Sequence, residues 1–243
     1  MDNNASYESA FTDFYNDSFF ADGQWVWPEN VPDWAGGPEA EEEFYSALRE
    51  AWMVSTDPRK RLLVAEHGGP AEWKALATDS DYMVRAAVAM VGNDAVQRFL
   101  CRDTSSFVRE YVANFAPPEV LRYLASFEPD PAVLNNIVKR CDIPSQQKVV
   151  ERMWDDPDFL KKIIPLLPQS QVEKLLSHDD QDVRIRVGEY GNRKQARAVL
   201  NDRSIPEGKK IFVEDHLAEL EEIAAVLRSG RHLERNRDMD MEL

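Results

Sequence analysis

The stretch DYMVRAAVAMVGN, residues 81–93, carries the pattern that decides the fold of this chain. It opens on an acid, repeats Val84, Val88 and Val91 along one side, follows the first valine with Arg85, and closes on a Gly-Asn pair. Residues 105–117, SSFVREYVANFAP, have nearly the same shape. A pattern that returns at a fixed spacing predicts a repeat architecture.

The pattern recurs through most of the chain. Aligned segments start, in steps of 24, 24, 25, 26 and 24 residues, at Lys60, Val84, Val108, Val133, Phe159 and Val183. The fourth residue after each start is β-branched: Val64, Val88, Val112, Ile137, Ile163 and Val187. A seventh, weaker copy places Ile211 in the same column. Such a column predicts a continuous apolar spine through stacked units.

Each copy also begins with a residue suited to capping a helix. Three positions before the starts stand Asp57, Asp81, Ser105, Asp130, Asp156 and Asp180. Their side-chain oxygens can accept the free amide hydrogens of a first helical turn. A second amphipathic segment follows each helix, as in DAVQRFL, where Val96, Phe99 and Leu100 are expected to face neighbours. Such a helix pair cannot bury its apolar face alone and must stack.

We therefore expect an all-α fold, a right-handed α-solenoid of about six or seven short two-helix repeats of 24–26 residues. Residues 1–45 are expected to form an acidic, aromatic N-terminal segment that caps the stack. Residues 46–229 are expected to form the solenoid and a C-terminal capping helix, with Gly230 ending that helix and 230–243 forming a flexible tail. The inward residues of the capping helix are expected to be Leu217, Leu220, Ile223, Ala224 and Leu227.

The combination of leucines followed by D-P-x-x-VR-x-x-VA-x-N at about 24 residues resembles the leucine-rich variant (LRV) repeat, and it is similar to short HEAT-type repeats. The resemblance covers roughly residues 57–200. It implies an architecture rather than an activity, and it implies that one helix of a repeat is often a 3₁₀ helix. The iron–sulfur cluster of one member of that family is not expected, because no cysteine precedes Cys101.

Charge is distributed unevenly along the chain. Residues 1–50 hold 12 acids and one basic residue, Arg49, whereas the whole chain has a formal net charge of −15. The rest of the chain is nearly balanced, so a strong attraction for the phosphate backbone of nucleic acid is not expected. Two cysteines, no long apolar run and no secretory signal favour a cytoplasmic protein without disulfides or membrane contact.

Two groups of residues are candidates for partner binding. Arginines follow the first residue of four copies at Arg61, Arg85, Arg109 and Arg184, with Leu134 and Leu160 interrupting the column. They form either a basic face that binds phosphate or an acidic partner, or a structural ladder in which each arginine bonds the capping acid or an end carbonyl of an adjacent repeat. Trp25, Trp27 and Trp34 lie among turn-forming residues, where they either cap the open apolar end or dock on a partner. Exposed side chains such as Arg122, Tyr123, Arg186 and Tyr190 are further candidate contacts.

No motif demands catalysis. The chain lacks GxGxxG, GxxxxGK[ST] and GxSxG, and none of its four histidines is spaced as a metal ligand pair. The acids around His178 coincide with the start of a repeat helix. We expect no catalytic residue, no metal and no cofactor.

Three functions remain open. The first is a non-enzymatic module that binds a partner protein through a face of the solenoid. The second is an acidic inhibitor, immunity protein or nucleic-acid mimic of a bacterial or phage mobile element, suggested by the charge of residues 1–50. The third is a HEAT-like DNA-binding protein or glycosylase, for which Trp73 and Trp154 are the candidate aromatic residues. The partner and the oligomeric state are not determined by the sequence.

Overall fold

The structure, a computed structural model, describes residues 20–21, 24–31 and 37–240. The chain divides into two compact units, residues 1–140 and 141–243. Apart from the short antiparallel pair β1 (Phe20–Ala21) and β2 (Gln24–Trp25), every regular element in the described residues is a helix. The predicted all-α repeat fold is therefore confirmed. The predicted boundaries at 45/46 and 229/230, the capping role of residues 1–45 and the flexible tail stay predictions.

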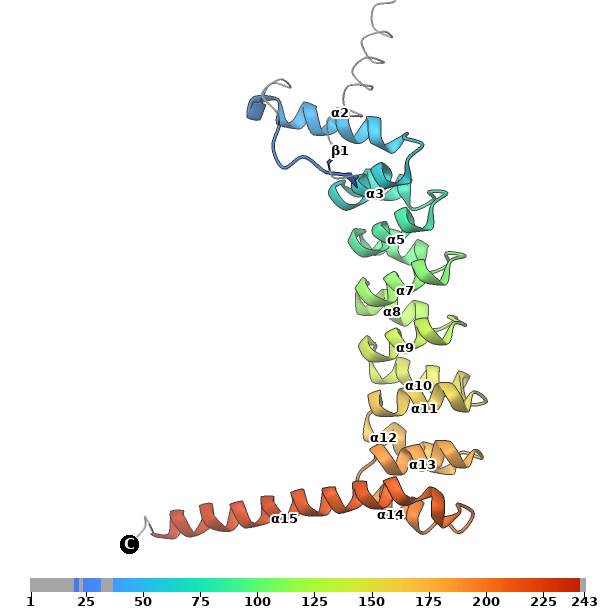
Figure 1. Cartoon of the computed structure of the whole chain (residues 1–243), viewed down its shortest axis with the longest axis vertical. Coiled ribbons are helices and arrows are strands. Elements are labelled where there is room, and N and C mark those ends of the chain that lie inside the picture. The colour runs from blue at the N-terminus through green and yellow to red at the C-terminus, as the bar shows by residue number, and fades with distance from the viewer. Residues whose placement is uncertain (1–19, 22–23, 32–36, 241–243) are drawn as a thin grey trace, which may run out of the picture. The chain divides into compact units, whose positions relative to one another are not determined.

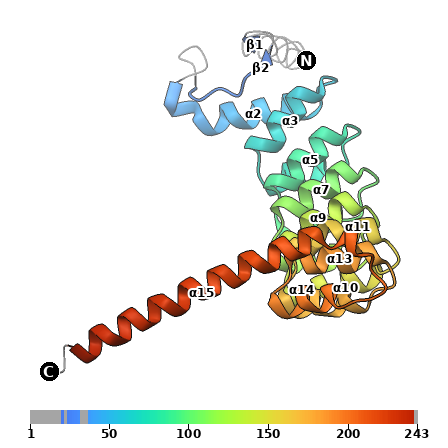
Figure 2. The same ribbon diagram turned by 60° about the horizontal axis from the view of Figure 1, so that its bottom comes forward.

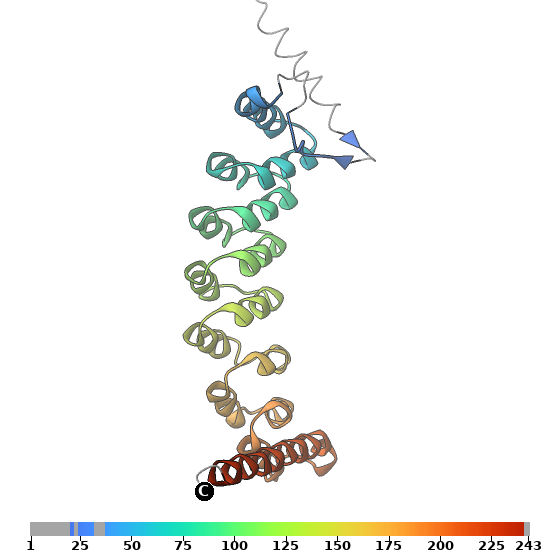
Figure 3. The same ribbon diagram turned by 90° about the vertical axis from the view of Figure 1, so that its left-hand side faces the viewer.

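Unit 1 stacks helix pairs in sequence order (Figures 1 and 2). Its elements after the β pair are η2 (Gly37–Ala40), α2 (Glu41–Met53), α3 (Pro58–His67), α4 (Pro70–Leu76), α5 (Tyr82–Val91), α6 (Asp94–Leu100), α7 (Ser106–Phe115), α8 (Pro118–Ala125) and α9 (Pro131–Arg140). The first helices of the repeats pack on one another as α3, α5, α7 and α9, and the second helices α6 and α8 pack in a parallel layer. Figure 3 shows the two layers from the side.

Unit 2 continues the same alternation with more 3₁₀ helix. Its elements are α10 (Ile143–Arg152), α11 (Pro157–Ile163), η3 (Ile164–Leu166), α12 (Gln169–Val172), η4 (Glu173–Ser177), α13 (Gln181–Tyr190), α14 (Arg193–Leu200), η5 (Glu207–Lys209) and α15 (Ile211–Asp240). Pro165 lacks the amide hydrogen that would continue α11, which fits the change to 3₁₀ geometry at η3. The 3₁₀ helices of the repeats are thus confined to this unit among the described residues.

The β-branched column forms the core of both units. Val64, Val88, Val112, Ile137, Ile163 and Val187 are all 0% exposed, so the prediction for these six positions is confirmed. Ile211, the seventh proposed member, is 55% exposed, and Val213 is buried instead. The register of the last copy shifts by two residues because α15 begins only at Ile211, after η5.

A helix begins directly after each of the six predicted capping residues. The carboxylates of Asp57, Asp81, Asp130, Asp156 and Asp180 each accept a backbone amide of the first helical turn. Ser105 is the N-cap residue of α7, as predicted, but the side-chain capping bond expected of it is absent.

The C-terminal helix departs from the sequence prediction in two ways. It continues through Gly230 to Asp240, so the predicted end at Gly230 is wrong. Ile223 and Leu227, expected to face inward, are 48% and 56% exposed. The physical reason is that α15 runs beyond α14 and leaves the rest of unit 2 (Figures 1 and 2). Within the described residues, no helix has both the length and the apolar character needed to cross a bilayer.

Helices α13 and α15 approach closely at a glycine. A Cβ atom at Gly188 would lie 2.8 Å from Cγ1 of Val213 and 3.0 Å from Cβ of Val199, distances that are too short for ordinary contacts. The equivalent residues in the first three repeats are the buried alanines Ala65, Ala89 and Ala113. A small residue after four of the six spine positions therefore lets neighbouring helices approach, whereas Val138 and Ile164 follow the other two.

The spine predicts a clear stability difference. We expect Ile137→Ala to lower the free energy of unfolding by about 3 kcal/mol, because it removes buried methyl groups and leaves a cavity. Ile211→Ala, at a largely exposed position, serves as the matched control and is expected to change stability by less than about 0.5 kcal/mol. Urea unfolding followed by circular dichroism measures both, and equal losses would contradict the assignment of the spine.

Candidate functional site

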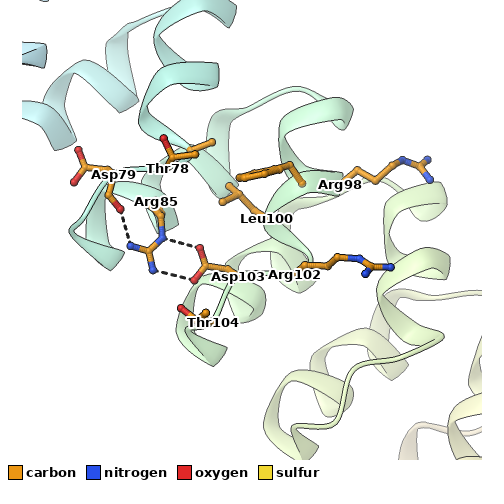
Figure 4. A pocket seen from close by; sticks show the side chains of 10 residues that line it. Thr78, Asp79, Arg85, Arg98, Leu100, Arg102, Asp103 and Thr104 are labelled. Atoms are coloured by element: carbon orange, nitrogen blue, oxygen red, sulfur yellow. Dashed lines mark hydrogen bonds and ion pairs between the residues drawn. The ribbon is translucent and has the colours of Figure 1, made fainter.

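The arginine column forms a ladder of ion pairs inside the stack. Arg85 of α5 donates from Nε and Nη2 to the two carboxylate oxygens of Asp103, at 2.6 and 2.9 Å (Figure 4). Its Nη1 donates to the backbone carbonyl of Asp79 at 2.7 Å. The side chains of Arg85 and Asp103 are 14% and 6% exposed. One guanidinium therefore connects the loop before its own helix with the loop before the next first helix.

The carboxylate of each pair has a second role. An oxygen of Asp103 accepts the backbone amide of Ser105 at 2.8 Å, two residues further on. Asp79 accepts from the amide of Asp81 in the same way, and Glu128 accepts from Asp130. These amides belong to the capping positions of the next helices. The acid that neutralises an arginine thus also orients the start of the following helix.

The same two-pronged geometry recurs at Arg61 and Arg109, whereas at Arg184 only Nε reaches the acid and Nη2 donates to the hydroxyl of Ser204. Arg61 pairs with Asp79 at 2.6 Å, Arg109 with Glu128 at 2.8 Å, and Arg184 with Asp202 at 3.0 Å. The third pair uses a glutamate, and it spans 19 residues where the others span 18. The extra residue belongs to the repeat whose step is 25 residues rather than 24.

Where the arginine is missing, its acid is missing too. Leu134 and Leu160 replace the arginine in two copies, and the positions that would hold their acids are Trp154 and His178. His178 is buried, its Nδ1 accepts the amide of Asp180 at 3.0 Å, and its Nε2 lies 2.8 Å from the carbonyl oxygen of Trp154. Since Nδ1 accepts, we assign the ring hydrogen to Nε2. The histidine thus takes over the amide contact that an aspartate makes elsewhere.

The ion pair between Arg61 and Asp79 changes the pKa values of both partners. Burial alone would raise the pKa of Asp79, but the hydrogen bond from Arg61 and the bond from the Asp81 amide together hold it below its ordinary value. The hydrogen bond with Asp79 in turn raises the pKa of Arg61. For Asp202, the Ser204 hydroxyl and amide are the largest contributions to a lowered pKa, ahead of Arg184. These carboxylates therefore stay ionised at neutral pH.

The predicted tryptophans are described only in part. Trp34 and the side chain of Trp25 lie outside the described residues. Trp27 stacks on His67 with ring centroids 4.8 Å apart and contacts Trp52 edge-on at 5.8 Å. These contacts join the segment before η2 to helices α2 and α3. A partner-binding role for the three tryptophans stays a prediction, as it does for the four ladder arginines.

The repeat pattern leaves a strip of aromatic side chains on the first helices of unit 1. Tyr82 contacts Phe107 edge-on at 5.5 Å, Phe107 lies 5.0 Å from Tyr111, and Tyr111 lies 5.8 Å from Phe115. Tyr82 and Phe115, at the two ends of this aromatic strip, are exposed. The sequence analysis missed the strip, although the spacing of Phe107, Tyr111 and Phe115 within α7 was a signal for it.

A second group of side chains lies on the second helices of the same unit. The guanidinium carbons of Arg98 and Arg102 each lie 5.6 Å from the ring centroid of Tyr123. Arg102 Nε also donates to the hydroxyl of Tyr123 at 2.8 Å. Figure 4 shows both arginine side chains directed away from the Arg85–Asp103 pair. Phe99, expected in the core, is instead exposed beside them, because no element covers that face of α6.

The other exposed candidates make local contacts. Arg122 pairs with Glu119 within α8 at 2.9 Å. Arg186 pairs with Glu189 at 2.9 Å, and its guanidinium carbon lies 4.2 Å from the ring centroid of Tyr190. Arg186 Nε also donates to the carbonyl of Lys161 on α11 at 3.4 Å, so this side chain contacts the preceding repeat as well.

Reactive groups are scarce in the described residues. Burial raises the pKa of Cys101 to about 12 and that of Cys141 to about 11, so neither thiol is ionised at neutral pH. No group of three or more histidine, cysteine, aspartate or glutamate side chains gathers there in a way that could hold a metal ion. The arrangement supports contact surfaces better than bond-forming chemistry.

A comparison with solved structures identifies the architecture. The chain superimposes on a structure described as "a leucine-rich repeat variant with a novel repetitive protein structural motif" with a TM-score of 0.57. The chain has the fold of a leucine-rich repeat variant. The match covers 88% of this chain and 83% of the other, at 20% sequence identity, and thus concerns the fold alone. Comparisons with family models and with curated proteins give no match.

The ladder predicts that a leucine–histidine pair can replace an arginine–acid pair. We expect Arg85→Leu to cost about 3 kcal/mol of unfolding free energy, because the buried carboxylate of Asp103 loses its partner. Arg85→Leu combined with Asp103→His copies the residues found at Leu160 and His178, and it is expected to recover at least half of that loss. Chemical unfolding of both variants measures the difference.

Arg59→Leu is the control for this experiment. Arg59 pairs with Asp57 on the surface, where solvent screens the pair, and its replacement is expected to change stability little. If Arg85→Leu cost no more than this control, the ladder would not hold the repeats together.

The lowered pKa of Asp79 predicts a dependence of stability on pH. The ionised carboxylate stabilises the fold above the pKa of an unfolded aspartate, about 3.9, and this contribution is lost as the pH falls through the lower folded-state value. We expect Asp79→Asn to be less stable than the unchanged chain by about 2 kcal/mol at pH 7, with the difference shrinking in acid. Thermal unfolding between neutral pH and pH 3 measures it, with Asp155→Asn as the exposed control. A pH-independent difference would contradict the prediction.

Proposed function

We propose that this chain is a non-enzymatic module that binds a partner protein through exposed side chains of its helical repeats. The observation that carries the proposal is the aromatic strip of Tyr82, Phe107, Tyr111 and Phe115, which the repeat fold does not require. Tyr82 and Phe115 are exposed and the two rings between them are half-buried, and a cluster of aromatic side chains that reaches the surface is typical of protein–protein contact sites. The strip spans two neighbouring repeats, as expected for a solenoid that contacts its partner over several units.

The nucleic-acid enzyme has less support. Trp73 donates from Nε1 to the carbonyl of Ala65 at 2.9 Å, and Trp154 lies against His178 with ring centroids 4.8 Å apart. Both rings therefore have structural contacts of their own. The arginines that would form a basic track are paired with acids inside the stack. The acidic-inhibitor alternative rests on residues 1–50, most of whose acids precede α2.

The proposed setting is a cytoplasmic one. Cys101 and Cys141 are both free thiols in the structure, which agrees with a reducing compartment. The proposal includes no cofactor and no metal.

The test is affinity capture from a lysate of the source organism. The immobilised chain is expected to retain a defined protein, and Tyr82→Ser combined with Phe115→Ser is expected to reduce its retention at least about tenfold by removing apolar contact area. Ile143→Ser combined with Phe212→Ser removes two exposed apolar side chains of unit 2 and is expected to retain the protein normally. Mass spectrometry quantifies the captured protein.

Two results would contradict the proposal. One is equal retention of every captured protein by the aromatic-strip variant and its control. The other is that the unchanged chain captures no protein even at low salt.

A further inference from the structure

The repeats carry a second column of charge that is separate from the ladder. Ten residues after each spine residue, on the second helix of the repeat, stand Lys74, Arg98, Arg122, Gln147, Glu173 and Arg197. Four of these six residues are basic, and three of the four lie in unit 1. The four basic residues are all exposed. This outer column therefore presents positive charge on a chain whose net charge is negative.

Unit 2 shows how this position accepts a carboxylate. Arg197 of α14 donates from Nη2 to Oε1 of Glu221 at 2.6 Å. Glu221 belongs to α15, a helix that carries several acids and packs on α14 and its neighbours with Leu217 at the contact. At this copy of the column, an acidic helix of the chain itself thus supplies both the carboxylate and the apolar contact.

In unit 1 the members of the column differ, because Arg122 pairs with Glu119 of its own helix whereas Lys74 and Arg98 have no such acid in the part of the chain that the structure describes. Among the described residues, no carboxylate lies within ion-pair distance of Arg98, Arg102 or Lys74. Arg98 and Arg102 are instead held over the ring of Tyr123, and Arg102 also lies 5.2 Å from the ring centroid of Phe127. Contacts with aromatic faces orient a guanidinium without neutralising its charge. Most of its N–H donors stay available.

Two hollows adjoin these cations. The apolar one, of about 560 Å³, lies between α4 and α6 and is lined by Pro70, Lys74, Ala95, Val96 and Phe99 among others. The other, of about 440 Å³, is polar as well as apolar: Phe99, Arg98 and Arg102 line it together with the ladder residues Asp79, Arg85 and Asp103, whose charges are already paired. Phe99 is shared by both and is 58% exposed. Charged donors and an exposed aromatic ring thus border the same surface of α4 and α6.

We propose that this surface of unit 1 binds an acidic amphipathic peptide segment of the partner protein. Arg98 and Arg102 bind its carboxylates, and Phe99 with the adjoining hollow receives its apolar side chain. The inference rests on the proposed function and names the chemistry of the partner. It extends to unit 1 the contact that α15 makes with Arg197 in unit 2.

Nucleic acid fits this surface less well than a peptide. A polyphosphate chain is bound by neutralising many phosphates along a track. Here three cations form a short patch on a chain of net charge −15, and the ladder arginines beside it are already paired. One or two carboxylates beside an apolar side chain match the patch in size and charge.

Fluorescence anisotropy with a labelled peptide tests the proposal on the full chain. The probe has the sequence of residues 214–227, EDHLAELEEIAAVL, and its neutral counterpart replaces Glu219, Glu221 and Glu222 by glutamine. We expect the acidic probe to bind, its affinity to fall as NaCl is raised, and the neutral counterpart to bind about tenfold more weakly or worse.

Two variants of the chain locate the binding site. Arg98→Gln combined with Arg102→Gln is expected to weaken binding of the acidic probe about tenfold, and Phe99→Ser by a similar factor. Arg59→Gln combined with Lys139→Gln removes the same charge from exposed positions elsewhere in unit 1 and is expected to leave the affinity within about twofold. Unchanged melting curves show that the variants are folded.

Several outcomes would overturn the inference. They are equal binding of the acidic and neutral probes, an arginine double variant that binds as the unchanged chain does, and tighter binding of a single-stranded oligothymidine at the same arginines. If the unchanged chain forms a dimer and the arginine double variant does not, the surface binds a second copy of this chain rather than a partner protein. If the lysate protein is still captured by the arginine double variant but lost by the aromatic-strip variant, the proposed function stands and this inference fails.

Discussion

The buried guanidinium between repeats is the constraint on which the rest of the structure depends. Because it is mostly removed from water, it needs a carboxylate and carbonyl oxygens at fixed positions. Asp103 meets this need for Arg85 and at the same time accepts the amide of Ser105. One side chain therefore sets the position of the loop, the start of the next helix and the stacking of two repeats. The apolar spine removes side chains from water, whereas the ion pair fixes the position of one repeat along the next.

Much of this fold could be predicted because each repeat contacts mainly its neighbours, so a single column of β-branched residues specifies the core. The partner of each arginine was harder to identify. The sequence analysis considered the capping acids, such as Asp81, whereas the ladder uses acids two residues earlier, such as Asp79. Phe99, Ile223 and Leu227 were placed inward because amphipathic spacing shows which face is apolar. It does not show whether another element covers that face.

The features most suggestive of binding in the sequence turn out to have internal roles in the structure. The regular arginine column is largely engaged in pairs between repeats. The side chains left exposed are those that differ from one repeat to the next, such as the rings of α7 and the cations of α6. In a repeat protein, regularity indicates what stacking requires. Departures from regularity show where a surface is specialised.

The ladder has a consequence for how such a chain can change length. Arg61 and Arg85 each meet an acid 18 residues later, and the spine residues Val64 and Val88 are one full step apart. Duplication or excision of a whole step between two such rungs therefore leaves every guanidinium with a carboxylate. A crossover that joined the chain after Arg109 to the segment after Leu160 would instead place His178 opposite Arg109 and leave its guanidinium without the carboxylate of Glu128. Growth by recombination is thus easiest between junctions of the same kind.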